Sequence, residues 1–225
     1  MGKNVMARLF TAKVGSADIA TQFGVADAPI VPVPDEMVEG DQGLIVIERD
    51  GRRELKAAQW GFPRRTRESR MGLEAPGIIG LVADLTNPMW EHVVVEPAAR
   101  CLIPLTHFAN PAGDKGTKTR SWFSLGDQPI AAWAGFWNET ETYGSVFAGM
   151  TMAANDVVMP FNDRMPVLVA PSEYERWLTG SIEDVIAFQF RPPVPANRIK
   201  VVHTGDLWRS GKVPDFIARS QMALL

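Results

Sequence analysis

Residues 44–62, LIVIERDGRRELKAAQWGF, place two strand-like runs on either side of the dipeptide Asp50-Gly51. An Asp-Gly pair tolerates the positive φ angles that tight β-hairpin turns require, and it is the best hairpin signal in the chain. The stretch therefore predicts an antiparallel hairpin with strands over 44–49 and 52–62.

Short strand-like runs continue on both sides of this hairpin, with turn-rich segments between them. Before it, residues 8–14 alternate apolar and polar side chains. After it, a basic loop over 63–80 precedes the remaining predicted strands, at 101–109, 120–125, 129–138, 145–153, 165–170 and 199–203. Irregularly spaced strands with a few short helices predict an α+β fold dominated by antiparallel sheet.

The predicted helices are short and are marked by capping residues. A side chain that can accept a hydrogen bond from a free backbone N–H stands before each of them. These are Ser16 before 17–23, Asn87 before 88–94, and the capping boxes Ser172/Glu175 and Ser181/Asp184 before the last two helices.

Composition indicates one domain over residues 1–225. At 225 residues and 46% hydrophobic side chains, the chain can bury about 70% of its unfolded surface. No apolar run reaches the roughly 18 residues of a membrane span, so no membrane contact is expected. We interpret the single cysteine, Cys101, as a buried thiol in a cytoplasmic protein. The three histidines lack metal-ligand spacing, so neither a metal nor a cofactor is expected.

Basic residues are concentrated in one part of an acidic chain. The net charge is −3, yet residues 49–70 hold eight basic and three acidic side chains. Such a segment can contact phosphates, or it can simply be a solvated loop. The candidate DNA-binding residues are Arg64, Arg65, Arg67 and Arg70, the adjacent Trp60, and Lys115, Lys118 and Arg120 on a second loop. Trp60 could stack on a base, and a core position is the alternative.

A series of short motifs in a fixed order identifies a resemblance that covers residues 6–212. The motifs are Met6-Ala7-Arg8-Leu9-Phe10, Trp60-Gly61-Phe62-Pro63, Pro88-Met89-Trp90, Arg100-Cys101-Leu102-Ile103-Pro104, Trp122-Phe123-Ser124-Leu125, Ala134-Gly135-Phe136-Trp137, 151–155 and Arg164-Met165-Pro166-Val167-Leu168. Together they resemble the SOS-response-associated peptidase family, also called abasic-site processing proteins. The resemblance implies branched sheets that form a pseudo-barrel with peripheral helices, and single-stranded or abasic-site DNA as the partner.

The family's chemistry begins at an N-terminal cysteine that is exposed when the initiator methionine is removed. The α-amine condenses with the ring-opened aldehyde of an abasic site, and the thiolate then closes a thiazolidine. By resemblance, an asparagine positions the cysteine, a glutamate transfers protons, and a histidine assists opening of the sugar ring.

This sequence departs from the family at all of these positions. Ala7 stands where the family has the cysteine, and Leu81 stands where it has the asparagine. Asn110 replaces the glutamate, and Asn162 replaces the histidine. A chain that starts at Met6 could expose the Ala7 amine, whereas one that starts at Met1 would cover it. Without sulfur, an imine could form but no thiazolidine could trap it. The sequence therefore predicts a catalytically inactive relative that binds DNA.

Two other functions remain open. A residual imine or lyase activity could use the Ala7 amine, or polar residues near the altered positions, namely Asp84, His107 and Asp163. Alternatively, the altered cleft could serve a non-DNA interaction protein. Convergence of Ala7, Leu81, Asn110 and Asn162 in space is the observation that would validate the assignment of these positions.

Overall fold

The Asp50-Gly51 hairpin is formed in the structure, a computed structural model that describes residues 9–26, 32, 34–64, 71–73 and 77–213. Strand β3 (Gln42–Arg49) pairs antiparallel with β4 (Arg52–Trp60), with Arg49 directly opposite Arg52. Asp50 and Gly51 have φ angles of 53° and 72°, as a tight turn between twisted strands requires.

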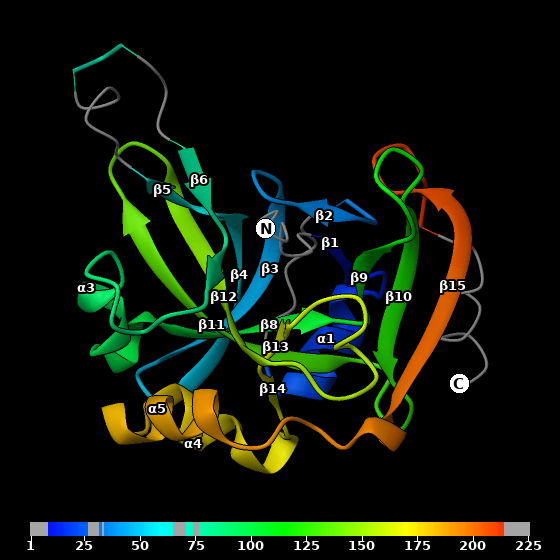
Figure 1. The fold of residues 1–225 in the computed structure, drawn as a ribbon. Coiled ribbons are helices and arrows are strands. Elements are labelled where there is room, and N and C mark those ends of the chain that lie inside the picture. Colours follow the sequence, from blue (N-terminus) through cyan, green and yellow to red (C-terminus); the bar gives the residue numbers. More distant parts are fainter. Residues whose placement is uncertain (1–8, 27–31, 33, 65–70, 74–76, 214–225) are drawn as a thin grey trace.

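The hairpin is part of a closed ring of strand pairings (Figure 1). β3 pairs with β8 (Arg100–Leu105), which pairs with β11 (Ala131–Thr140), which pairs with β12 (Gly144–Ala153). The parallel pairing of β12 with β4 closes the ring. Because most pairings are antiparallel and the helices are few and short, the predicted α+β class is confirmed.

Short strands branch from this ring. β7 (Leu81–Val82) pairs parallel with β12, and β13 (Arg164–Pro166) pairs antiparallel with it. β14 (Leu168–Val169) pairs with β11. In sequence, β7 lies between the ring strands β4 and β8, whereas β13 and β14 follow β12.

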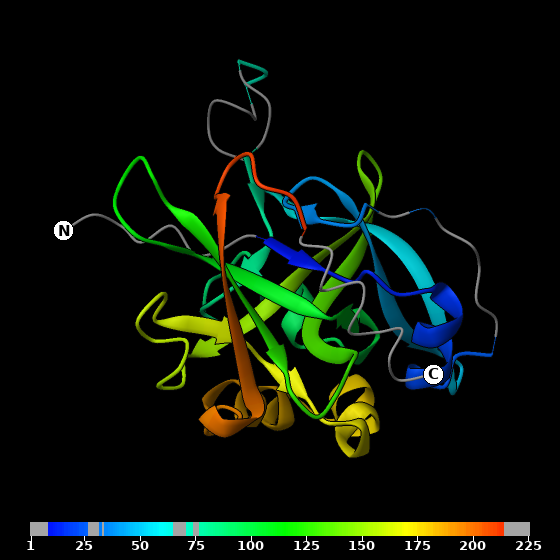
Figure 2. The ribbon, with the colours of Figure 1, turned by 90° about the vertical axis from the view of Figure 1, so that its right-hand side faces the viewer.

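A second sheet lies beside the ring in the strand order β15-β10-β9-β1-β2. Its strands are β1 (Leu9–Thr11), β2 (Met37–Val38), β9 (His107–Ala112), β10 (Thr119–Leu125) and β15 (Ile199–Leu207). A separate pair, β5 (Phe62–Arg64) and β6 (Gly77–Ile79), stands where a loop over 63–80 was predicted. This pair and the β9–β10 connection rise from the same end of the molecule (Figures 1 and 2).

The single strand predicted over 101–109 is wrong, because the chain turns a corner at Thr106. The backbone N–H and the hydroxyl of Thr106 both donate to the carbonyl oxygen of Thr11, at 2.8 and 3.0 Å. The two halves of the run become β8 in the ring and β9 in the second sheet. The corner therefore links the two sheets.

Four helices and three 3₁₀ turns cover the outside of the described part. The helices are α1 (Ser16–Phe23), α3 (Glu91–Val94), α4 (Tyr174–Thr179) and α5 (Ile182–Phe190), and the turns are Pro97–Ala99, Pro171–Glu173 and Ala196–Arg198. No described helix is long and apolar enough to cross a membrane. Cys101 is fully buried in β8, which confirms its interpretation as a core thiol, and burial raises its pKa.

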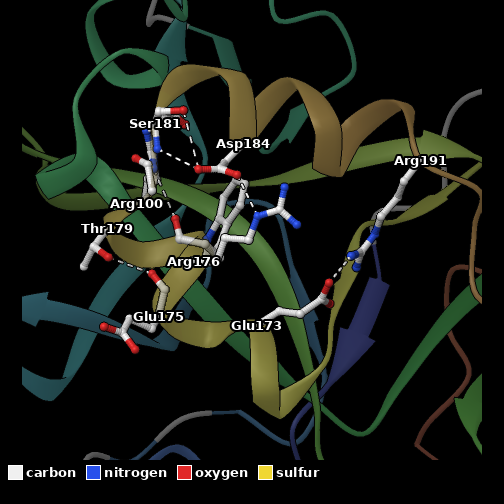
Figure 3. Close-up of polar contacts among 10 residues, drawn as sticks. Arg100, Glu173, Glu175, Arg176, Thr179, Ser181, Asp184 and Arg191 are labelled. Carbon is white, nitrogen blue, oxygen red and sulfur yellow. Dashed lines mark hydrogen bonds and ion pairs between the residues drawn. The ribbon is translucent and has the colours of Figure 1, made fainter.

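The junction of α4 and α5 is fixed by charged side chains (Figure 3). The buried guanidinium of Arg100 donates to the carbonyl oxygens of Gly180 and Ser181. Asp184 accepts from the backbone N–H of Ser181 at 2.9 Å, which confirms that capping box. The predicted box at Ser172 is wrong, because Pro171 opens a 3₁₀ turn that the carboxylate of Glu173 caps instead.

A cluster of three aromatic side chains lies in the core. The ring of Phe10 lies edge-on to those of Trp60 and Trp133, with centroids 4.9 and 5.6 Å apart. Trp133 can approach β12 because residue 149 is glycine, where an added Cβ would lie 1.9 Å from the indole ring. The backbone N–H of Gly149 also donates to the carbonyl oxygen of Gly80, beside β7.

We expect Gly149→Ala to lower the free energy of unfolding by on the order of 2 kcal/mol or more, because a methyl group there overlaps a buried indole. Urea unfolding measures the loss. Gly205→Ala, also in a strand but with no atom within 4 Å of the added carbon, is the matched control. Equal stability of the two variants would contradict the close packing of Trp133 on β12.

Candidate functional site: a small cavity between the two sheets

A cavity of about 30 Å³ lies where the ring, its branches and the second sheet meet. Most of its wall is apolar, and its few polar groups come from β9, β12 and the segment around β13. The lining residues are Leu9, Phe10, Trp60, Leu81, Phe108, Asn110, Trp133, Thr151, Asn162, Arg164, Met165 and Pro166. The volume is room for one or two water-sized groups.

Three of the four positions named by the sequence resemblance converge on this cavity. Leu81, Asn110 and Asn162 all line it, although they lie on β7, on β9 and just before β13. Ala7 lies outside the described residues, and Leu9, two residues further along the chain, is part of the wall. Residues far apart in the sequence thus form one site.

Asn110 and Asn162 form a buried pair whose orientation is fixed by the backbone. The N–H of Arg164 donates to Oδ1 of Asn162 at 3.1 Å. Since that oxygen is the acceptor, Nδ2 of Asn162 is the donor to Oδ1 of Asn110, at 3.1 Å. The two side chains are 1% and 5% exposed. Both side chains are amides, so neither can act as a general acid or a general base near neutral pH.

Among the described residues that line the cavity, Arg164 is the one ionisable residue. Its Nε and Nη2 donate to the hydroxyl of Thr151, and Nη2 also donates to the carbonyl oxygen of Ala83. Burial lowers the pKa of the guanidinium and the charge of Asp163 opposes this, but an arginine stays protonated. None of the ion pairs among the described residues involves Arg164.

Helix α5 also contacts backbone groups that Arg164 contacts. Nε2 of the buried Gln189 donates to the carbonyl oxygens of Ala83 and Thr151, at 3.3 and 3.2 Å. Arg164 uses these same two carbonyl oxygens. Neither Gln189 nor the role of Arg164 was identified from the sequence, although Arg164 begins a quoted motif and lies two residues after Asn162.

The structure divides the candidate DNA-binding residues into three groups. Arg64 and Lys115 are exposed and Lys118 is partly exposed. Arg65, Arg67 and Arg70 lie outside the described residues. Trp60 is 1% exposed and Arg120 is also buried, so neither presents a free surface. The Trp60 indole N–H donates to the carbonyl oxygen of Gly80, and Arg120 is ion-paired with Glu36.

The three alternative polar residues do not line the cavity. Asp84 is exposed and bonded to Thr86, which lowers its pKa, and Asp163 is exposed. Because side chains alternate along a strand, His107 lies on the opposite face of β9 from Phe108 and Asn110. Within the described residues, no group of three side chains is placed to hold a metal ion.

The model of the family described as SOS response associated peptidase (SRAP) matches residues 6–204 of this chain. The chain belongs to the SRAP family. No curated protein matches it. The resemblance drawn from short motifs is therefore confirmed, and the SRAP match includes the segments that carry Leu81, Asn110 and Asn162.

Several solved structures share this fold. A protein from Bordetella bronchiseptica aligns with a TM-score of 0.73 and 19% identity, over 88% of this chain and 99% of that one. A protein from Bacteroides thetaiotaomicron aligns with a TM-score of 0.69 and 15% identity, over 93% of this chain and 94% of that one. A phage-related protein from Bordetella bronchiseptica aligns with a TM-score of 0.68 and 14% identity, over 88% of this chain and 93% of that one. At these identities the likeness supports the SRAP fold only.

The partly buried imidazole of His107 predicts a loss of stability in acid. Burial lowers its pKa to about 4, whereas an unfolded chain has a histidine pKa of about 6.5. The unfolded state therefore binds more protons between these values, so stability falls as the pH drops from 6.5 to 4. In His107→Gln this part of the loss should be absent.

Urea midpoints measured at pH 7 and pH 4.5 test this expectation, with His92→Gln on the exposed surface of α3 as the control. A variant at His107 that loses as much stability on acidification as the wild type would show that this ring does not cause the acid sensitivity.

Proposed function

We propose that this SRAP protein binds single-stranded DNA, with a preference for abasic sites, and does so without the durable covalent bond that the family resemblance implies. The observation that carries the proposal is the convergence of Leu81, Asn110 and Asn162 on one cavity. At the positions where the resemblance implies a polar amide, an acid and a base, the cavity has a leucine and two amides bonded to each other.

The loss of chemistry follows from the residues present. Proton transfer by a positioned acid or base contributes typically about 10²–10⁴-fold to a rate, and neither Asn110 nor Asn162 can supply it. Arg164 stays protonated and so cannot act as a base. Ala7 has no sulfur, so an imine formed at its amine would have no ring to close. Turnover through this cavity would therefore be slow.

DNA binding is supported by the position of the exposed positive charges. Arg64 lies on β5, and Lys115 and Lys118 lie in the β9–β10 connection, at the same end of the molecule (Figures 1 and 2). β9 also carries Asn110, and β6, the partner of β5, leads directly into β7 with Leu81. Both basic elements thus extend from strands that line the cavity, where backbone phosphates could meet them.

The size of the cavity supports a lesion without a base. About 30 Å³ admits a hydroxyl or carbonyl group but not a nucleobase. Trp60 and Trp133 take part in the wall and donate their indole N–H groups to the carbonyl oxygens of Gly80 and Met150. These two hydrogen bonds hold both rings against the backbone that surrounds the cavity.

Affinity for single-stranded DNA should fall steeply with salt, because each phosphate contact contributes a slope of about −0.7 in log K against log salt. Lys115→Gln and Lys118→Gln should each make the slope shallower by about 0.7 in a fluorescence anisotropy titration. Lys200→Gln, at the other end of the same sheet, is the control. Binding that is absent, or that does not depend on salt, would contradict the proposal.

Incubation with abasic single-stranded DNA should give no lasting adduct, whether the chain starts at Met1 or at Met6. The combined substitution Ala7→Cys, Leu81→Asn, Asn110→Glu and Asn162→His, on a chain that starts at Met6, should restore one. Denaturing gels detect the product. A borohydride-dependent adduct of the unaltered chain would instead favour residual imine chemistry at Ala7, and a borohydride-independent adduct would contradict the proposal.

A further inference from the structure

The side-chain nitrogen of Asn110 is a buried donor without a partner in the part of the chain that the structure describes. The orientation of the asparagine pair assigns Oδ1 of Asn110 to the bond with Asn162, which leaves Nδ2 at the other end. Among the described residues, no acceptor reaches this nitrogen, and the side chain is 1% exposed. A buried N–H group without a partner is unfavourable, and the cavity that Asn110 lines is the adjacent space in which an acceptor could lie.

The other polar groups of the wall do not offer this acceptor. The side-chain oxygens of Asn110 and Asn162 already accept hydrogen bonds, and the Thr151 hydroxyl accepts from Arg164 and donates to the carbonyl oxygen of Val82. The indole nitrogens of Trp60 and Trp133 are donors that the backbone satisfies. Among the described residues of the wall, this leaves one free amide donor and one charged side chain, the positive Arg164.

We infer that Nδ2 of Asn110 is directed at the ligand and makes the cavity selective for a small oxygen acceptor without a hydrogen, either a carbonyl oxygen or a phosphate oxygen. This inference rests on the proposed function and names what the cavity recognises. A carbonyl oxygen would come from the ring-opened aldehyde of an abasic site, and a phosphate oxygen from the DNA backbone. An ionised aspartate at this position has no N–H group and could not donate this hydrogen bond.

The substitution Asn110→Asp isolates this donor. One carboxylate oxygen of the aspartate can still accept from Nδ2 of Asn162, so the hydrogen bond between the two side chains is kept. The other carboxylate oxygen replaces Nδ2, so the free N–H donor becomes a negatively charged acceptor. Asn197→Asp, on the exposed 3₁₀ turn that leads into β15 and not among the residues that line the cavity, adds the same charge elsewhere.

Affinities are measured for three otherwise identical single strands: one with an abasic site, one in which that site is reduced to the alcohol by borohydride, and one intact. A carbonyl acceptor predicts about tenfold weaker binding of Asn110→Asp to the abasic strand alone. A phosphate acceptor predicts a similar loss for all three strands. If Asn110→Asp matches Asn197→Asp on every strand that the wild type binds, the inference is overturned.

A second measurement does not depend on DNA binding. In ¹⁵N-labelled protein, the Asn110 side-chain signal, assigned by its loss in Asn110→Asp, should shift in a saturable way with inorganic phosphate or with acetone. A shift in a protein that binds no DNA would leave the inference standing and the proposed function contradicted. No shift with either probe would overturn the inference even in a protein that binds DNA.

Discussion

The structure depends on the ability of one strand, β12, to pair on both edges along its length. It closes the ring between β4 and β11 and also holds β7 and β13. This requires a residue without a side chain at position 149, because the indole of Trp133 occupies the space where a Cβ would be. The packing of Trp133 against Gly149 therefore helps to position β7 and β13, which both pair with β12. These two strands supply Leu81 and Arg164 to the cavity wall.

The polar part of the cavity is ordered by one backbone group. The N–H of Arg164 can only donate, so it determines which end of Asn162 is the acceptor, and this in turn determines the orientation of Asn110. A site built in this way keeps a fixed arrangement of hydrogen bonds but does not move protons. Its electrostatic character is positive and donor-rich, which differs from the acid and base that the family resemblance implies.

Features that depend on neighbouring residues could be predicted from the sequence. The Asp50-Gly51 turn and the cap at Ser181 are local, and both are formed. The corner at Thr106 was missed because its partner, Thr11, lies 95 residues away in sequence. Similarly, the charge of Arg120 is visible in the sequence, but its burial against Glu36 is set by distant strands. The cavity residues were found because the family resemblance supplied contacts that spacing alone could not.

Helix α5 gives the cavity a connection to the outer surface. Gln189 and Arg164 share the carbonyl oxygens of Ala83 and Thr151, so the helix and the cavity cation are held by the same two backbone groups. On the outside of that helix, Ile186 and Phe190 are exposed. A substitution or a binding event that displaces α5 would therefore shift the position of the Arg164 guanidinium through these two carbonyl oxygens, with every cavity residue left unaltered.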